Sequence, residues 1–185
     1  MTPWANGASV VDMYDSAEQL SAVDHPELLG APVATMIGLL PGARVFSIDP
    51  AMSDTEALCA HFGEDPSTAG NCVIVRGRRG EVTRTVACVA LATTRVDVNK
   101  VVRKKLDVRK ASFAPMDDAV AESGMEYGAI TPVGLPADWP IWIDSRVAEA
   151  EQVCIGAGTR AAKLLVSGAD LAHLPHAEVV EGLAG

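Results

Sequence analysis

Two long apolar runs flank a glycine turn in the middle of the chain. Residues 71–77 (NCVIVRG) and 83–92 (TRTVACVALA) are rich in strand-forming side chains, and Gly77 and Gly80 mark the segment between them. β-Branched residues favour strands, and glycine supplies the backbone conformations that a tight hairpin turn requires. The pattern predicts an antiparallel hairpin, and any fold of this chain must accommodate it.

The other expected elements mix strands and helices without regular alternation. Strands are expected at 43–49, 139–144, 151–156 and 162–168, and 178–183 is either a last strand or a tail. Helices are expected at 26–40, where either Pro26 or Pro32 can occupy the first turn, and at 54–61, 98–106, 116–123 and 169–174. This order indicates an α+β fold, a single domain with a mixed β-sheet and flanking helices. No apolar run approaches the roughly 20 residues of a membrane span.

Charge is distributed very unevenly along the chain. The net charge is −9, and five acidic residues but no Lys or Arg precede Arg44. Between Arg76 and Lys110, eleven basic residues face only three acidic ones, so this window carries +8 and the rest of the chain carries −17. The window is either a solvated helix face or a local site for phosphate or nucleic acid. The acidic total argues against a protein coated in DNA.

The stretch at 124–140 combines three glycines and three prolines and is expected to form a shaped loop. Gly128 and Gly134 bracket Ile130, Thr131 and Pro132 within it. Glycines let backbone N–H groups approach a ligand, and successive free N–H groups form an anion-binding nest or an oxyanion hole. From the residues alone, a structural turn and a functional loop are both open.

Other familiar chemistry finds little support in the sequence. GAGTRA (156–161) matches one form of the dinucleotide fingerprint but lacks the helix that should follow, so we interpret it as a tight turn between strands. No Cys/His cluster has zinc spacing, and we predict neither a metal nor a cofactor. The scattered cysteines predict a reduced, cytoplasmic protein; they are Cys59, Cys72, Cys88 and Cys154.

The glycine-rich stretch and the segments after it resemble the YbaK and prolyl-tRNA synthetase-associated editing domains. SGMEYGAITPVG (123–134) is similar to their glycine–glycine–isoleucine–serine–proline signature, with Gly128 and Pro132 at its Gly-x-x-x-Pro positions. Further similarities follow in the same order downstream, at Ile143-Asp144, at Gly156 and Gly158, at Lys163-Leu164 and at Asp170-Leu171. The resemblance covers roughly residues 43–181. We therefore expect an acidic N-terminal arm with one helix at 1–42 and an editing domain at 43–185.

The resemblance implies a metal-free hydrolase that cleaves the ester of mischarged aminoacyl-tRNA. Backbone N–H groups at Gly128 and Ala129, which replaces the second glycine of the signature, are expected to steady the oxyanion. The substrate's own ribose hydroxyl is expected to help activate water. The expected substrate-binding residues are Asn71, Thr131, Pro132, Lys163, Gly156 and Gly158. The basic window supplies the expected tRNA contacts, which are Lys100, Arg103, Lys104 and Lys105.

Asn71 departs from the pattern of these editing domains. The family usually carries a lysine at the start of this strand, whereas this chain reads Asn71-Cys72-Val73. An asparagine donates and accepts neutral hydrogen bonds but carries no charge. A cation from elsewhere, such as Lys163, Lys110 or Arg76, is the candidate to replace it.

Two functions of different classes remain open on the sequence. One is a free-standing aminoacyl-tRNA deacylase that acts in trans on mischarged tRNA. The other is a non-catalytic module of the same fold that holds aminoacyl-tRNA or docks on an aminoacyl-tRNA synthetase. The first would release amino acid over many turnovers, and the second would only bind.

Overall fold

The computed structural model describes residues 14–185, so the first part of the expected N-terminal arm, residues 1–13, lies outside the described chain. The strands of the described part are β1 (Leu20–Ser21), β2 (Arg44–Ser47), β3 (Gly70–Arg79), β4 (Val82–Leu91), β5 (Lys110–Phe113), β6 (Ile141–Asp144), β7 (Val153–Gly156), β8 (Ala162–Val166) and β9 (Ala177–Val180). Its α-helices are α1 (Ala31–Met36), α2 (Thr55–Phe62), α3 (Arg103–Lys105), α4 (Met116–Ser123), α5 (Ser145–Ala148) and α6 (Gly168–Ala172). None of its helices is long and apolar enough to cross a membrane.

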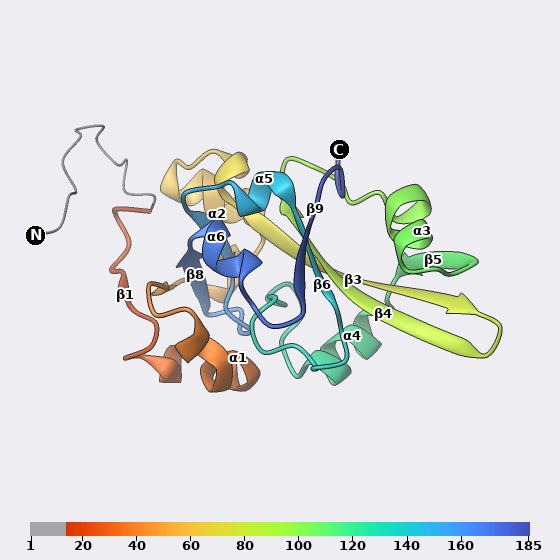
Figure 1. The fold of residues 1–185 in the computed structure, drawn as a ribbon. Coiled ribbons are helices and arrows are strands. Elements are labelled where there is room, and N and C mark those ends of the chain that lie inside the picture. The colour runs from red at the N-terminus through yellow and green to blue at the C-terminus, as the bar shows by residue number, and fades with distance from the viewer. Residues whose placement is uncertain (1–13) are drawn as a thin grey trace, which may run out of the picture.

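The strands form two sheets, which confirms the α+β class and adds a second sheet to the mixed one that was expected (Figure 1). The smaller sheet has the order β1-β2-β8-β7 and is antiparallel throughout. The larger has the order β5-β3-β4-β6-β9 and is mixed, because β6 runs parallel to both β4 and β9. A parallel bridge between Ala69 and Cys154 links the two sheets.

The predicted hairpin is confirmed as the longest feature of the larger sheet. β3 and β4 pair over their whole length, from Gly70 opposite Leu91 to Arg79 opposite Val82. Gly80 closes the turn with a φ of 61°. The end of the hairpin projects away from the rest of the molecule in Figure 1. β5, which the sequence analysis missed, pairs with β3 at the sheet edge. Its sequence KASF is short and has only one strong strand former, Phe113.

The predicted helices form with some changes. α2 begins after Asp54, whose side chain accepts from the N–H of Glu56, and it ends at the left-handed Gly63. Of the two starts expected for the helix within 26–40, the structure has the one with Pro32 in the first turn, and α1 lies between two 3₁₀ turns, η1 (Pro26–Leu28) and η2 (Ile37–Leu39). A proline at position 32 excludes a continuous helix from 26, because its ring would clash with the carbonyl four residues earlier.

The basic helix expected at 98–106 is a π-helical turn, η5 (Val98–Val102), followed by the short α3. Asp97 caps it by accepting from the N–H of Lys100. Val98, Val102 and Leu106 are buried as expected, and Val101 packs against the same cluster.

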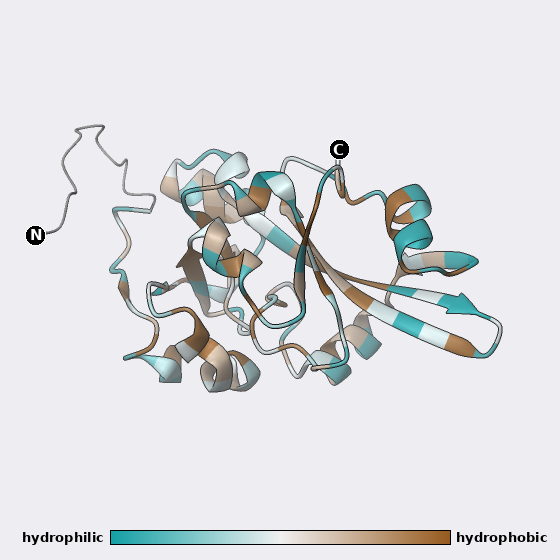
Figure 2. Ribbon diagram, viewed as in Figure 1, coloured by the Kyte–Doolittle hydropathy of each residue, from teal (hydrophilic) through white to brown (hydrophobic). Residues whose placement is uncertain are grey.

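The core explains why the second half of β4, residues 86–91, is apolar without interruption. Ala87 and Val89 face the cluster that joins the two sheets, whereas Val86 and Cys88 face the cluster under η5 and α3. Both faces of the larger sheet are therefore covered, and alternation of polar and apolar residues is lost. In Figure 2 the central parts of β3, β4 and β6 are brown, and teal segments gather on α3 and toward the hairpin end.

Asp144 at the end of β6 has a structural role. It is fully buried, and its carboxylate accepts from Arg146 Nε at 2.8 Å and from the N–H of Ala184 at 2.9 Å. Burial opposes its ionisation, but these hydrogen bonds outweigh that cost and hold the pKa of Asp144 below its ordinary value of 3.8. The Ile143-Asp144 segment thus ties β6 to α5 and to the end of the chain.

Candidate functional site

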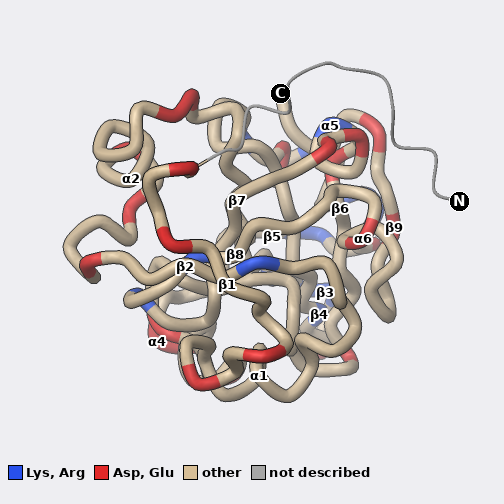
Figure 3. The backbone as a smooth tube through the Cα atoms, turned by 90° about the vertical axis from the view of Figure 1, so that its left-hand side faces the viewer, with Lys and Arg blue, Asp and Glu red and all other residues tan. Residues whose placement is uncertain are grey.

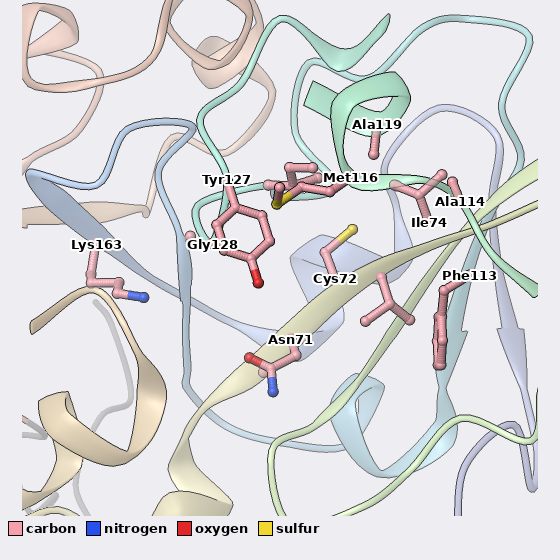
Figure 4. A pocket seen from close by; sticks show the side chains of 14 residues that line it. Asn71, Cys72, Ile74, Phe113, Ala114, Met116, Ala119, Tyr127, Gly128 and Lys163 are labelled. Atoms are coloured by element: carbon pink, nitrogen blue, oxygen red, sulfur yellow. The ribbon is translucent and has the colours of Figure 1, made fainter. Parts of the chain in front are cut away.

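An apolar pocket of about 430 Å³ lies between β3, α4 and the glycine-rich loop (Figure 4). Its polar side chains are Asn71, Tyr127 and Lys163, which lie on one side of the view. The rest of the wall is mainly apolar and includes Cys72, Val73, Ile74, Phe113, Ala114, Met116, Ala119 and Ile130. Such a pocket suits an uncharged group with a polar end.

A second, polar compartment of about 780 Å³ adjoins the apolar pocket. The two share Asn71, Tyr127 and Gly128 in their walls. The polar compartment is completed by residues at the start of α2 and on the β7–β8 turn, including Ser53, Asp54, Thr55, Glu56 and Arg160. A ligand with one apolar and one polar part can therefore lie across the junction at Gly128.

The glycine-rich loop is irregular, as expected, and backbone contacts fix its shape. Gly128 has a φ of 77°, a left-handed conformation that favours glycine. The N–H of Gly158 donates to the carbonyl of Ala129 at 2.9 Å, and the N–H of Glu126 donates to the carbonyl of Gly158 at 3.0 Å. A Cβ at Gly156 would lie 2.5 Å from the carbonyl oxygen of Ala129, so glycine is required for this approach.

The loop has free backbone donors at two residues that border the apolar pocket. The N–H groups of Gly128 and Ile130 have no hydrogen-bond acceptor within residues 14–185, and both residues line the apolar pocket. The N–H of Ala129 instead donates to the carbonyl of Glu126 at 3.0 Å. The expected oxyanion donor at Ala129 is therefore engaged in the turn, and Ile130 presents a free donor in its place.

Arg160 holds the loop against the chain before α2. Its Nη1 donates to the carbonyl of Tyr127 at 3.2 Å, and its Nη2 donates to the carbonyl of Pro50 at 3.0 Å. Its guanidinium also lies close to the open side of Gly128, where an added Cβ would meet Nη1 at 3.1 Å. The loop, the β7–β8 turn and the start of α2 are thereby joined around the polar compartment.

Lys163 is the buried cation of the pocket. Only 6% of its surface is exposed, and its Nζ donates to the carbonyl of Ser53 at 2.7 Å. Burial lowers the pKa of the Lys163 amine, while Cys154 and Asp54 oppose this effect. A poorly solvated amine of this kind interacts strongly with any charge that develops nearby.

Two polar groups near Lys163 retain hydrogen-bonding capacity. Asn71 accepts from Thr55 Oγ1 at 3.1 Å through its side-chain oxygen, so its amide NH₂ group is available. Ser53 Oγ is buried and has no hydrogen-bond partner in the described chain. An added Cβ at Gly128 would lie 3.9 Å from this hydroxyl. Unpaired buried polar groups are costly, and a bound ligand would relieve that cost.

Some predicted site residues lie elsewhere. Asn71, Gly128, Gly156 and Lys163 line the apolar pocket, but Thr131, Pro132 and Gly158 do not. Thr131 is fully buried within the loop, and Pro132 borders a separate depression beside Leu39 and Trp139. Gly158 is needed for packing, because a Cβ there would lie 2.7 Å from Val33 Cγ2.

The four basic residues expected to contact tRNA do not border either compartment. Lys105 pairs with Glu178 at 2.6 Å and lies over the ring of Trp142. Arg103 donates to the carbonyl of Asn99 and lines a different groove. Lys100 on η5 and Lys104 on α3 are exposed near Arg103 in the sequence.

The sequence analysis missed several residues of the site. Tyr127 directly precedes Gly128, so its position next to the motif could have predicted that it lines the site. Ser53 and Thr55 carried only the signal of a helix start, and Phe113 and Met116 belong to a strand edge and helix that gave no functional pattern.

Neither Cys72 nor a cluster of metal-ligating side chains offers chemistry at this site. Burial raises the pKa of the Cys72 thiol, so this pocket cysteine is protonated at neutral pH and is a poor nucleophile. Among residues 14–185, no three His, Cys, Asp or Glu side chains lie together as a metal site would need.

Comparison with protein families tests the resemblance to editing domains that the glycine-rich loop suggested. The family model of the aminoacyl-tRNA editing domain matches residues 49–174. This chain belongs to the aminoacyl-tRNA editing domain family. The match includes the glycine-rich loop, Asn71 and Lys163.

Solved structures show the same fold as this editing domain at low sequence identity. A proposed trans-editing enzyme for prolyl-tRNA synthetase has a TM-score of 0.64 and 16% identity, over 75% of this chain and 85% of that one. A hypothetical protein has a TM-score of 0.69 and 20% identity, over 77% and 91%. A proposed signal transduction protein from Marinobacter aquaeolei has a TM-score of 0.52 and 18% identity, over 84% of this chain but 31% of that one.

The substitution Gly156→Ala tests the close approach that shapes the loop of this editing domain. The added methyl group would collide with the Ala129 carbonyl, and we expect a loss of about 1–3 kcal/mol in the free energy of unfolding. Gly38→Ala is the matched control, because a Cβ there meets nothing within 4 Å. Urea denaturation measures both. Equal stability of the two variants would contradict the account of the loop.

Proposed function

We propose that this protein is an aminoacyl-tRNA deacylase that acts in trans on mischarged tRNA. The aminoacyl side chain occupies the apolar pocket, and the terminal adenosine occupies the polar compartment. The observation that carries the proposal is the pair of free N–H groups in the loop, one at Gly128, where the two compartments meet, and one at Ile130, which lines the apolar pocket. The ester carbonyl of a substrate lying across this junction would reach them.

The free N–H groups suit the charge that ester hydrolysis creates. Water attacks the carbonyl carbon, the carbonyl oxygen becomes an oxyanion, and the bond to the ribose oxygen then breaks. One proton of the water ends on that ribose oxygen and restores the tRNA hydroxyl. Preorganised donors aimed at such an oxyanion are commonly the largest single contribution to catalysis. Lys163 adds a positive charge on the same pocket wall.

The resemblance to the editing domains implies that the substrate itself helps to activate water. No Asp, Glu or His lines the apolar pocket, whereas Asp54 and Glu56 line the polar compartment, where the Asp54 side chain caps α2. The ribose hydroxyl next to the ester is the group expected to act, and the unpaired Ser53 hydroxyl can orient it. The absence of Asp, Glu and His from the lining of the apolar pocket also supports the second candidate function, a module that binds aminoacyl-tRNA or a synthetase without turnover.

The pocket favours an uncharged apolar amino acid. Its inner wall includes Ile74, Ala119 and Ile130, none of which can pair with a charged side chain. Burial of an unpaired charge costs far more than burial of an apolar group. Mischarged tRNA carrying a small or medium apolar residue is therefore the expected substrate class.

Gly128→Val tests the oxyanion donors. The larger side chain would enter the space near Arg160 Nη1 and strain a backbone with positive φ. We expect turnover of mischarged tRNA to fall about 100-fold or more, comparable with loss of an oxyanion donor. Circular dichroism checks that the variant is folded. A folded variant with wild-type turnover would mean that the loop is only a structural turn.

Lys163→Met and Asn71→Lys together test whether Lys163 replaces the missing lysine. Methionine keeps the length of the side chain and removes its charge, and we expect turnover to fall about 10- to 100-fold. Adding Asn71→Lys to this variant should restore part of the lost turnover. The single variant Asn71→Lys should bind substrate more weakly, because it adds a second ammonium beside Lys163. Wild-type turnover in Lys163→Met, or no rescue, would contradict the replacement.

A further inference from the structure

A strongly basic groove of about 610 Å³ lies around the outer parts of β3 and β5. Its cations are Arg76, Arg78, Arg103, Arg109 and Lys110, and none of the described residues that line it is acidic. They come from β3, from α3 and from the segment that leads into β5. The fold therefore gathers cations from separate segments into one concave surface.

Acidic side chains neutralise only some of the cations in this groove. Arg76 pairs with Asp118 at 3.0 Å and with Glu122 at 2.8 Å, and Arg78 pairs only with the exposed Glu81. Arg103, Arg109 and Lys110 make no ion pair with an acidic side chain of the described chain. Outside the groove, Arg79 and Arg84 pair with Asp107, and Lys105 pairs with Glu178.

The arrangement also carries a cost in stability. Arg78 and Lys110 are direct neighbours across β3 and β5, and like charges in this position repel. The opposite end of the molecule, which faces the viewer in Figure 3, carries mostly acidic residues. Cations concentrated at one end of an acidic protein are typical of a surface that meets a polyanion.

The groove continues from the apolar pocket along the same two strands. On β3, Asn71 to Ile74 line the pocket and Arg76 to Arg78 line the groove. On β5, Phe113 lines the pocket and Lys110 to Ser112 line the groove. Asn71 and Arg78 are seven residues apart, or about 23 Å at about 3.3 Å per residue. A ligand that reaches both must be an extended molecule at least about 20 Å long.

We propose that this groove binds the phosphate backbone of the acceptor arm of the tRNA whose 3′ end enters the pocket. The inference rests on the proposed function, and it moves the tRNA contacts from Lys100 and Lys104 to Arg103, Arg109 and Lys110. Arginine and lysine hold phosphates without reading bases, so the groove contributes affinity and orientation for many tRNAs. Amino-acid selection stays with the pocket.

The double variant R109Q/K110Q tests the groove, and K100Q/K104Q is the control with the same change of charge. Binding of uncharged tRNA is measured by fluorescence anisotropy over a series of salt concentrations. We expect R109Q/K110Q to weaken binding about 10-fold or more at low salt and to reduce the salt slope by about 1.4–1.8. The control should keep the wild-type slope. R109Q/K110Q should unfold at the wild-type temperature or above it, because it removes repulsion.

Equal effects of the two double variants would overturn the proposal, since only net charge would then matter. Binding of polyglutamate through the groove, with no binding of tRNA, would assign the surface to an acidic protein and also overturn it. Hydrolysis of a 3′-aminoacyl-adenosine by the wild-type protein tests the proposed function separately, because this substrate has no phosphate. Hydrolysis without groove-dependent tRNA binding would reject the groove alone, and groove-dependent binding without hydrolysis would reject the deacylase alone.

Discussion

The backbone contact between the glycine-rich loop and the β7–β8 turn is the constraint on which the pocket depends. Hydrogen bonds run in both directions, from Gly158 to Ala129 and from Glu126 to Gly158. A side chain at Gly156 would force the two segments apart. The start of α1 backs the turn, because the N–H of Gly30 donates to the carbonyl of Ala157. Segments far apart in sequence thus fix the wall that presents the free N–H groups.

The positive charges of the molecule fall into two environments with different physical consequences. Lys163 is buried in the pocket, where low solvation makes its charge act strongly over a short range. Arg109 and Lys110 are exposed in the groove, where salt screens them beyond a Debye length of about 10 Å. The first environment suits the charge of a reaction, and the second suits reversible contact with a polyanion.

Local sequence signals predicted much of the fold and only part of the site. The hairpin around Gly80 and the helix after Asp54 follow from residues that act on their own neighbours. The second sheet and the strand β5 depend on partners far away in sequence. The break before α1 is local, because it follows from Pro32. In the site, the glycine motif of the sequence pointed to Gly128. The hydrogen bond from the Ala129 N–H to the Glu126 carbonyl could not be predicted, because it forms only in the folded turn. The same holds for Ser53, whose hydroxyl is notable only because it is buried without a partner.

The central claim is that the junction of the two compartments turns over an ester. Multiple-turnover release of amino acid by the wild-type protein, measured with a panel of tRNAs charged with apolar, polar and charged residues, tests it most directly. The account predicts many moles of amino acid released per mole of protein from a subset of the apolar substrates, and little from those with charged side chains. Stoichiometric binding without release from any member of the panel would contradict it.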